Sequence, residues 1–394
     1  MKHLLPVIIT LFVIAALLRI DFYFNILYLL LAVYLLSKAW MQHAMQRMHA
    51  RRRFVNRAFT GEEIPVTLEL RNTSWLPVPW VEIHDSLPVG LASPPFYRQV
   101  ISLGGRQTAR FEYTLHSYRR GYYAIGPLHL HTGDLLGLMP QASSRQEREY
   151  VIIYPRVVPL NKLGLPTHSP LAVLPAPAPL FEDPTRVMGT RAYQVGDSPR
   201  RIHWSASASA GHLLVKRYQP AIARETLVCL DMTRENYDPK RIYDASELAV
   251  TVAASLANHI ILRERLAVGL ATQALDPLDE AVSRFKLPTR RERAHLMSVL
   301  EVLARVQLTE APPLPFADFL RRESLALPWG ATLVVITGRE SDALFAALLN
   351  LRQRGFAVAL ILVMAEAADT SAHSAESLGF PVYRVQRERD VEVI

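Results

Sequence analysis

The stretch from Arg191 to Tyr218 holds the densest set of side chains that could bind an anion or move a proton. Its candidate binding residues are Tyr193, Gly196, Asp197, Arg200, Arg201, His203, Trp204 and Lys216. One interpretation is a structural network, in which Asp197 pairs with an arginine and Trp204 packs between two domains. The other is a docking or catalytic patch whose cations bind an anion. Buried charges need partners, and this segment carries its own, which favours the structural network.

A short helix is predicted inside this stretch. Asp197 or Ser198 can cap a helix start, and Pro199 suits the first turn because its missing N–H costs nothing there. The helix would carry residues 200–204, so that Arg200 stacks on Trp204 one turn later. Gly211 would end it before a strand over residues 213–218.

Hydrolysis is the main catalytic alternative. It would use His203 as the base, with Asp197 and either Ser205 or Ser207. Catalytic triads draw their members from separate elements, because base, nucleophile and orienting group must converge from different directions. These residues share one short segment, so the chain is predicted not to be an enzyme. A hydrolase or metal-dependent enzyme built on Asp197 and His203, or on Asp231, is the alternative.

Composition narrows the function classes further. The chain has 394 residues, half of them hydrophobic, and a formal net charge of +8. Two blocks of cations stand out, at residues 47–57 and 200–217, and they lack the interleaved aromatic side chains of a nucleic-acid surface. The single cysteine, Cys229, excludes a disulfide within the chain and fits a reducing compartment. No nucleic acid and no small-molecule substrate are expected.

Residues 1–40 are predicted to form two transmembrane helices, over Leu4–Leu18 and Phe22–Leu36, joined as a hairpin by a short polar break. A cleaved signal peptide followed by one anchor is the less favoured alternative. Cationic residues flank both ends, so the positive-inside bias places both in the cytoplasm. Residues 41–57 form a basic juxtamembrane segment that also suits anionic lipid headgroups. The expected location is the inner (cytoplasmic) membrane, multi-pass, with the globular part in the cytoplasm.

Residues 58–159 alternate apolar and polar residues in short runs separated by turns, which predicts a small β-sandwich. His129 and His131 share one strand face, but the sequence offers no third metal ligand beside them. Residues 160–190 are rich in proline and are predicted to be a loop-like linker. Residues 191–220 form the segment described first.

Residues 221–394 alternate strands and helices, which predicts a mostly parallel sheet covered by helices on both faces. Expected strands are 225–231, 267–271, 331–337, 357–363 and 381–385; expected helices are 246–263, 291–306, 316–325 and 341–354. Neither a GxGxxG run after the first strand nor a GxxxxGK[ST] run occurs, so nucleotide binding has no support.

One set of residues within the Arg191–Tyr218 stretch resembles the signature of the domain-of-unknown-function-58 family. The set is Tyr193, Gly196-Asp197, Arg200-Arg201, Ile202, Trp204, Ser207-Ala208 and Lys216. The resemblance implies a multidomain chain: a transmembrane hairpin, a β-rich segment, and an α/β von Willebrand factor A-like (Rossmann-type) domain. It also implies a MoxR-type AAA+ ATPase as partner. The expected function is a membrane-anchored cytosolic scaffold or adaptor that binds membrane lipid and protein partners during assembly or maturation of other complexes.

The same resemblance implies a divalent-ion site of the pattern Asp-x-Ser-x-Ser. Here the pattern reads Asp231, Thr233 and Glu235, and residues 337–340 (TGRE) stand where a second Asp is expected. Thr289 is the candidate loop threonine. Because hard cations need several oxygen ligands, the site is interpreted as degenerate, and no metal and no cofactor are expected. Asp231 would instead accept backbone amides.

Overall fold

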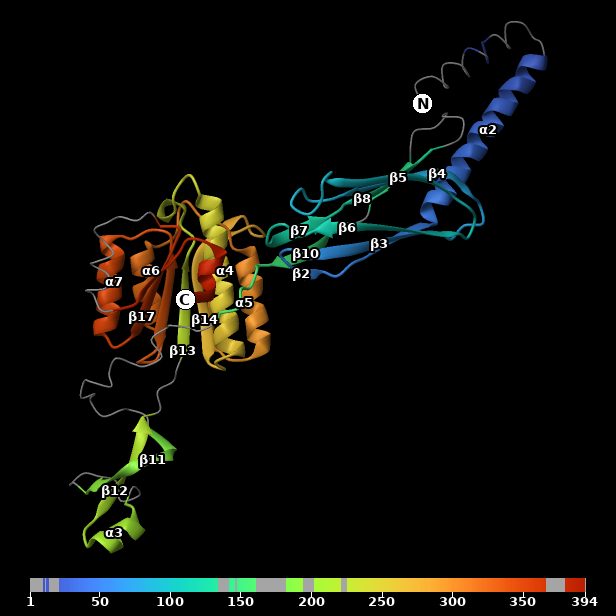
Figure 1. The fold of residues 1–394 in the computed structure, drawn as a ribbon. Coiled ribbons are helices and arrows are strands. Elements are labelled where there is room, and N and C mark those ends of the chain that lie inside the picture. The colour runs from blue at the N-terminus through green and yellow to red at the C-terminus, as the bar shows by residue number, and fades with distance from the viewer. Residues whose placement is uncertain are drawn as a thin grey trace. The chain divides into compact units, whose positions relative to one another are not determined.

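The structure is a computed structural model that describes residues 10, 12–13, 21–133, 142–145, 147–160, 182–193, 202–220, 225–365 and 380–393. The chain divides into two compact units, residues 1–156 and residues 157–394. Figure 1 shows the elements of each unit.

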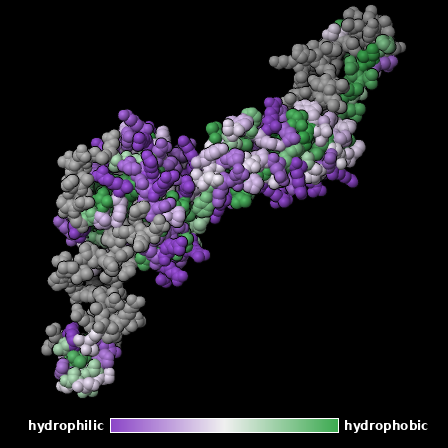
Figure 2. All heavy atoms as spheres, viewed as in Figure 1, coloured by the Kyte–Doolittle hydropathy of each residue, from purple (hydrophilic) through white to green (hydrophobic). Residues whose placement is uncertain are grey.

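The first unit begins with the apolar helix α2 (Asp21–Gln46). Only 11% of its most apolar window is buried, so large apolar side chains stay exposed along it. Figure 2 shows this helix as a hydrophobic surface. Near its end, Met41 and Ala44 are buried, and the Trp40 indole donates a hydrogen bond to the Pro77 carbonyl. The predicted run Phe22–Leu36 lies in α2, whereas the predicted run Leu4–Leu18 falls almost wholly outside the described residues.

The rest of the first unit is β-rich, as predicted. Three sheets have the orders β1-β3-β6, β2-β10-β7 and β5-β4-β8-β9. The strands are β1 (Met48–Arg53), β2 (Arg57–Phe59), β3 (Glu63–Asn72), β4 (Val78–Ser86), β5 (Phe96–Leu103), β6 (Thr108–His116), β7 (Gly121–Ile125), β8 (Leu128–Thr132), β9 (Ala142–Arg145) and β10 (Glu149–Tyr154). Two apolar clusters form the core, and each draws side chains from more than one sheet.

The interpretation of residues 47–57 as a lipid-facing basic patch is wrong in part, because β1 turns every second side chain inward. Arg52 is buried, and its guanidinium forms two hydrogen bonds to the Asp85 carboxylate, at 3.0 and 2.6 Å. The Tyr113 hydroxyl donates to the same carboxylate at 2.7 Å. Burial, and the nearby charge of Asp85, raise the pKa of Tyr113 above its usual range. Arg53, on the outer face, pairs with Glu69.

The second unit contains a six-stranded sheet in the order β15-β14-β13-β16-β17-β18. The strands are β13 (Glu225–Asp231), β14 (Ala267–Asp276), β15 (Ala281–Arg290), β16 (Thr332–Thr337), β17 (Ala357–Val363) and β18 (Val382–Val385). All neighbours are parallel except β15, which pairs antiparallel with β14 and was not predicted. From β13 the chain builds one half of the sheet and then returns to build the other. The gap between β13 and β16 is therefore the topological switch point.

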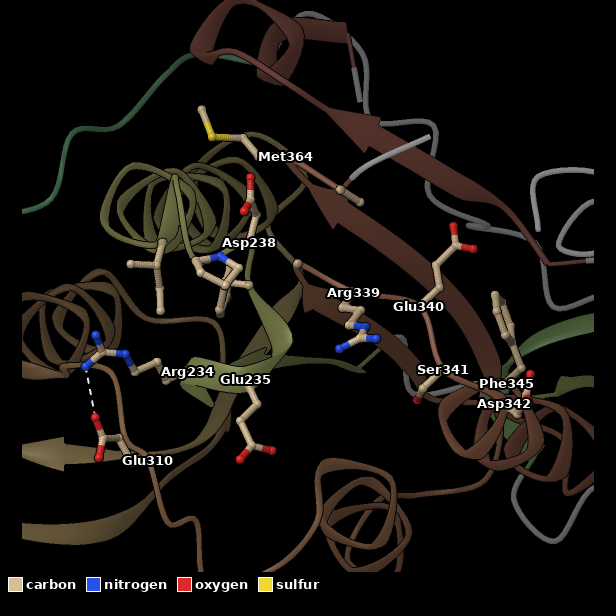
Figure 3. Close-up of a pocket in the computed structure, with 15 residues that line it drawn as sticks. Arg234, Glu235, Asp238, Glu310, Arg339, Glu340, Ser341, Asp342, Phe345 and Met364 are labelled. Carbon is tan, nitrogen blue, oxygen red and sulfur yellow. Dashed lines mark hydrogen bonds and ion pairs between the residues drawn. The ribbon is translucent and has the colours of Figure 1, made fainter. Parts of the chain in front are cut away.

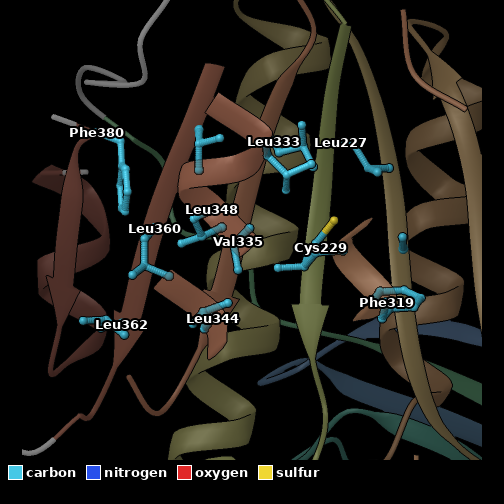
Figure 4. Close-up of a cluster of buried hydrophobic side chains, with 14 of the residues drawn as sticks. Leu227, Cys229, Phe319, Leu333, Val335, Leu344, Leu348, Leu360, Leu362 and Phe380 are labelled. Carbon is cyan, nitrogen blue, oxygen red and sulfur yellow. The ribbon is translucent and has the colours of Figure 1, made fainter. Parts of the chain in front are cut away.

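Helices cover both faces of this sheet (Figure 1). They are α4 (Ile242–Leu262), α5 (Arg293–Arg305), α6 (Phe316–Ser324) and α7 (Asp342–Gln353), with short 3-10 turns η3 (Arg234–Asn236) and η4 (Glu388–Val393). Figure 4 shows Cys229 of β13 among apolar side chains from α6, α7 and neighbouring strands. Helix α4 has the length and hydropathy of a membrane span, but 78% of its window is buried, so it is a core helix. The predicted α/β alternation is confirmed.

Candidate functional site

The signature segment folds as a hairpin of β11 (Glu182–Ala192) and β12 (Leu214–Pro220), with the short helix α3 (Trp204–Ala210) before β12. Strand β11 begins inside the stretch predicted to be a loop-like linker. Its pairing slips between Asp183 and Val187, around Pro184, which cannot donate to a ladder. Residues 161–181 of that linker lie outside the described residues.

The predicted helix start is wrong. Helix α3 begins at Trp204, while Ile202 forms a β-bridge with Val215. His203 is the cap: its Nδ1 accepts a hydrogen bond from the backbone N–H of Ala206 at 3.2 Å. The predicted stacking of Arg200 on Trp204 involves Arg200, which lies outside the described residues. The predicted C-terminal stop is confirmed, since Gly211 adopts φ 71°, where glycine has no steric penalty.

The serines of the catalytic alternative lie close to His203. The Ser205 hydroxyl is 3.1 Å from Nδ1, the nitrogen that also accepts from Ala206. Ser207 is buried and donates to the His203 carbonyl while accepting from the Leu214 amide. Of the other candidates, Tyr193 bonds to Leu213 through its backbone, Lys216 pairs with Thr190 across the hairpin, and Trp204 is 67% exposed. The remaining four lie outside the described residues: Gly196, Asp197, Arg200 and Arg201.

In the second unit, Asp231 ends β13 and is almost fully buried. Its Oδ1 accepts from the Thr233 amide at 2.9 Å. Its Oδ2 accepts from Asn236 Nδ2 at 2.7 Å and from the Thr337 hydroxyl at 2.9 Å. Burial raises the pKa of Asp231, and these donors oppose the shift. The carboxylate thus joins the loop after β13 to the end of β16 through neutral donors.

This arrangement does not fit a divalent ion. Both Asp231 oxygens already accept from protein N–H or O–H groups, and the Asn236 amide points hydrogen toward the oxygen that a cation would need. The candidate Thr289 lies at the other end of the sheet, where its hydroxyl bonds to Glu225 at the start of β13. The expectation that Thr289 joins Asp231 is therefore wrong. The expected role for Asp231, accepting a backbone amide, is confirmed.

A hollow of about 870 Å³ opens beside this network, at the switch point of the sheet. The loops after β13 and β16 form its walls (Figure 3). Gly338 makes the approach of these loops possible, since a Cβ there would lie 2.5 Å from the Tyr237 ring and 2.6 Å from the Asn236 carbonyl. The Tyr237 hydroxyl donates to the Asp231 carbonyl. Ligands of open α/β sheets bind at such switch points.

The hollow is acidic. Among the described residues, its charged lining comprises Arg234, Glu235, Asp238, Glu310, Arg339, Glu340 and Asp342. Arg234 pairs with Glu310 at 2.9 Å, and Glu340 pairs with Arg384 at 3.0 Å (Figure 3 draws the first pair). Glu235, Arg339 and Asp342 are exposed. Five carboxylates against two guanidiniums favour a cationic ligand that reaches in from solvent.

Sequence reasoning missed the acidic hollow and the two groups that support it, Asn236 and Tyr237. Asn236 follows Asp231 by only five residues, which is close enough for its side-chain amide to reach back across the loop. That spacing could have predicted that the Asp231 carboxylate is hydrogen-bonded within the chain. In the first unit, it also missed that β4 places His84 opposite His129 and Glu82 opposite His131. Within the described residues, no three His, Cys, Asp or Glu side chains are arranged to hold a metal ion.

Comparison with known proteins supports the resemblance. Residues 189–321 match the family described as "Protein of unknown function DUF58". The "Uncharacterized protein YeaD" of Bacillus subtilis (strain 168) is 24% identical over 302 residues, covering 72% of this chain and 73% of YeaD.

Two solved structures are similar at low scores. A von Willebrand factor type A protein from Catenulispora acidiphila has a TM-score of 0.30 at 9% identity, covering 45% of this chain and 42% of that one. An aerotolerance-related membrane protein from Bacteroides fragilis NCTC 9343, carrying multiple mutations to serines, has a TM-score of 0.30 at 14% identity, covering 42% of this chain and 93% of that one. The fold given above rests on this chain's own strand order. The family resemblance drawn from the Arg191–Tyr218 stretch is confirmed: over residues 189–321 the chain matches the DUF58 family.

Proposed function

We propose that the chain is a membrane-held cytosolic scaffold whose acidic hollow binds a basic segment of a protein partner. The observation that carries the proposal is the state of Asp231, whose oxygens are already engaged beside an open, charged hollow. A buried acid held in this way stiffens the two loops that wall the hollow. The loops then present a fixed, exposed surface of the kind that recognises a partner.

The membrane anchor is α2. Residues 21–40 rise ~30 Å as an α-helix, which matches the hydrocarbon thickness of a bilayer. This part of the helix exposes apolar side chains, whereas the following turns pack on the β-rich unit. Leu4–Leu18 supplies the first arm of the proposed hairpin. The cations that flank both ends support an inner (cytoplasmic) membrane location with the globular part in the cytoplasm.

The partner is a MoxR-type AAA+ ATPase, as the family resemblance implies, and the complex serves assembly or maturation of other proteins. The acidic lining of the hollow supports a lysine- or arginine-rich segment as the contact. The proposal involves no turnover, cofactor, nucleic acid or small-molecule substrate.

Affinity capture of the full chain from membranes in mild detergent, followed by mass spectrometry, tests the proposal. Wild type is expected to enrich a MoxR-type ATPase, and the Glu235→Lys/Asp342→Lys variant is expected to lose it. Glu112→Lys reverses an exposed charge on the β-rich unit and serves as the matched control. Capture without the ATPase, or equal capture by all three baits, would refute the proposed partner or its site.

A hydrolase is the second candidate, favoured only by the 3.1 Å approach of Ser205 to His203. Asparagine also caps helices well but cannot act as a base. If His203 is a cap, His203→Asn retains the cellular function that His203→Ala weakens. If His203 is a base, both variants lose it equally.

A further inference from the structure

We propose that the two loops beside the end of α2, residues 72–77 and 104–107, form a second membrane contact that inserts Trp75 among anionic lipid headgroups. This inference rests on the proposed membrane span of α2. It adds that the β-rich unit is not merely tethered by the helix but lies directly on the bilayer surface.

The first loop is held to α2 at two levels. The Trp40 indole donates to the Pro77 carbonyl at 2.9 Å. Just past the end of α2, the Thr73 amide and hydroxyl both donate to the Arg47 carbonyl, at 3.0 and 2.8 Å. Residues 72–77 therefore run alongside the helix from Trp40 to Arg47. This stretch rises ~10 Å along the helix axis and comes directly after the apolar part of α2. If that apolar part spans the hydrocarbon, the stretch lies where the bilayer changes from hydrocarbon to headgroups.

The second loop is locked onto the first. The Arg106 amide donates to the Ser74 carbonyl at 2.8 Å, and buried Asn72 donates through Nδ2 to the Gly104 carbonyl at 3.0 Å. At Gly105 a Cβ would lie 2.1 Å from the Trp75 carbonyl oxygen, so only glycine allows this contact. The two loops therefore form one rigid surface, which would insert without an ordering cost.

Trp75, in the first of these loops, has 72% of its area exposed. An indole ring that is exposed to water keeps a large apolar surface hydrated, which is unfavourable. At a membrane interface the ring lies partly in apolar surroundings and its N–H finds a polar partner. Trp40 of α2, whose indole bonds to Pro77 at the end of the same loop, is 41% exposed. Together the two rings resemble the aromatic belt of a membrane protein.

The charge of this surface suits anionic lipid. Residues 35–50, 70–78 and 103–109 contain no aspartate or glutamate. Their cationic side chains include Arg47, Arg71 and Arg106, which are all exposed. Each cation near an anionic leaflet adds to the attraction. An acid-free surface around an exposed indole at the end of a membrane helix therefore favours a lipid partner over a protein one.

Tryptophan quenching by brominated lipid tests this inference on the full chain in phosphatidylglycerol-containing vesicles. Bromine placed near the headgroups is expected to quench wild type, and Trp75→Phe is expected to remove a distinct part of that quenching. Trp204→Phe is the matched control, because Trp204 is equally exposed but belongs to the signature hairpin. Arg71→Gln/Arg106→Gln is expected to reduce the Trp75-dependent part, as is replacement of phosphatidylglycerol by phosphatidylcholine.

Leu29→Trp separates the inference from the anchor on which it rests. Leu29 is exposed in the middle of α2, so a tryptophan there is quenched by bromine placed deep in the acyl chains if the helix spans. One outcome would overturn the loop contact and leave the anchor intact. In it, Leu29→Trp is quenched by the deep bromine, but Trp75→Phe loses no more headgroup-level quenching than Trp204→Phe does. Absence of deep quenching in Leu29→Trp would overturn both.

Discussion

Both units bury carboxylates, and one from each unit, Asp85 and Asp231, can be compared because their hydrogen-bond partners differ in kind. Asp85, in the β-rich unit, is paired with the guanidinium of Arg52, which comes from a strand 33 residues away. Asp231, in the α/β unit, accepts only from neutral amide and hydroxyl donors. A charge partner keeps the ionised form stable in a dry site, whereas neutral donors leave part of the desolvation cost in place. The first arrangement fixes a core, and the second fixes two surface loops.

The largest expected effect is at Asp85. Asp85→Ala leaves the buried charge of Arg52 with the half-exposed Glu149, 3.5 Å away, as an ion-pair partner. The loss of the buried partner should cost ~3 kcal/mol of the free energy of unfolding of the β-rich unit. Hydrogen exchange of β3, β4 and β6 in the full chain measures this locally. The apolar replacement Arg52→Met/Asp85→Leu should recover most of the loss, because no unpaired charge remains. Recovery no better than Asp85→Ala would show that the ion pair itself supplies the stability.

At Asp231 the expected loss is smaller. Asp231→Ala removes no charge partner, but it leaves three donors without their acceptor, at a cost of ~1–3 kcal/mol. Hydrogen exchange should rise in the loops that follow β13 and β16 and stay unchanged in the β-rich unit. Equal acceleration in both units would contradict the local role assigned to this carboxylate.

Sequence patterns anticipated the Asp231 region far better than the Asp85 region. Strands β13 and β17 are parallel and covered on both faces, so they read as continuous apolar runs. Asp231, Thr233 and Asn236 lie within a few residues of one another, which makes their contacts local. Asp85, in contrast, meets Arg52 and Tyr113 across two sheets. Strands β1 and β6 both pair with β3, whereas β4 pairs with β5 and β8 in another sheet, and neither the register nor the packing of the sheets is visible in one sequence.

The missed elements have specific causes. Strand β1 was read as a charged juxtamembrane segment because His49 and four arginines at positions 47, 51, 52 and 53 obscure the inward alternation of Met48, Ala50 and Arg52. Strand β15 alternates exposed polar residues and contains a proline, so it resembles a loop. Helix α3 was placed too early, because Asp197-Ser198-Pro199 is a common helix start, whereas the observed cap is a histidine.

The pH dependence of stability gives a third test of the difference between the ion-paired Asp85 and Asp231, which has only neutral donors. Burial raises the pKa of Asp231 in the folded chain above its unfolded value of about 3.9. The folded state therefore holds the proton more tightly, and this contribution is fully present below pH ~4 and is lost as the pH rises through the folded pKa. The melting temperature of wild type relative to Asp231→Asn should thus fall as the pH increases from 4. A difference that is constant with pH would contradict the raised pKa.

The smallest expected effect is at Thr337. Thr337→Val removes one hydroxyl donor to Asp231 with little change in shape, at a cost of ~1 kcal/mol. It should also raise the pKa of Asp231 further, because one opposing donor is gone. The matched change Thr309→Val, a buried threonine in a loop of the same unit that does not contact Asp231, should leave the pH profile of wild type unchanged.

The proposed function depends most on one contact, in which the acidic hollow beside Asp231 binds a protein partner through charge. The most direct measurement is the affinity of the purified MoxR-type ATPase of the same organism for the membrane-reconstituted full chain, at increasing salt. Binding is expected to weaken steadily with salt and to fall at least tenfold for Glu235→Lys/Asp342→Lys, while Glu112→Lys behaves as wild type. Undetectable binding, or binding that neither salt nor the double charge reversal alters, would contradict it.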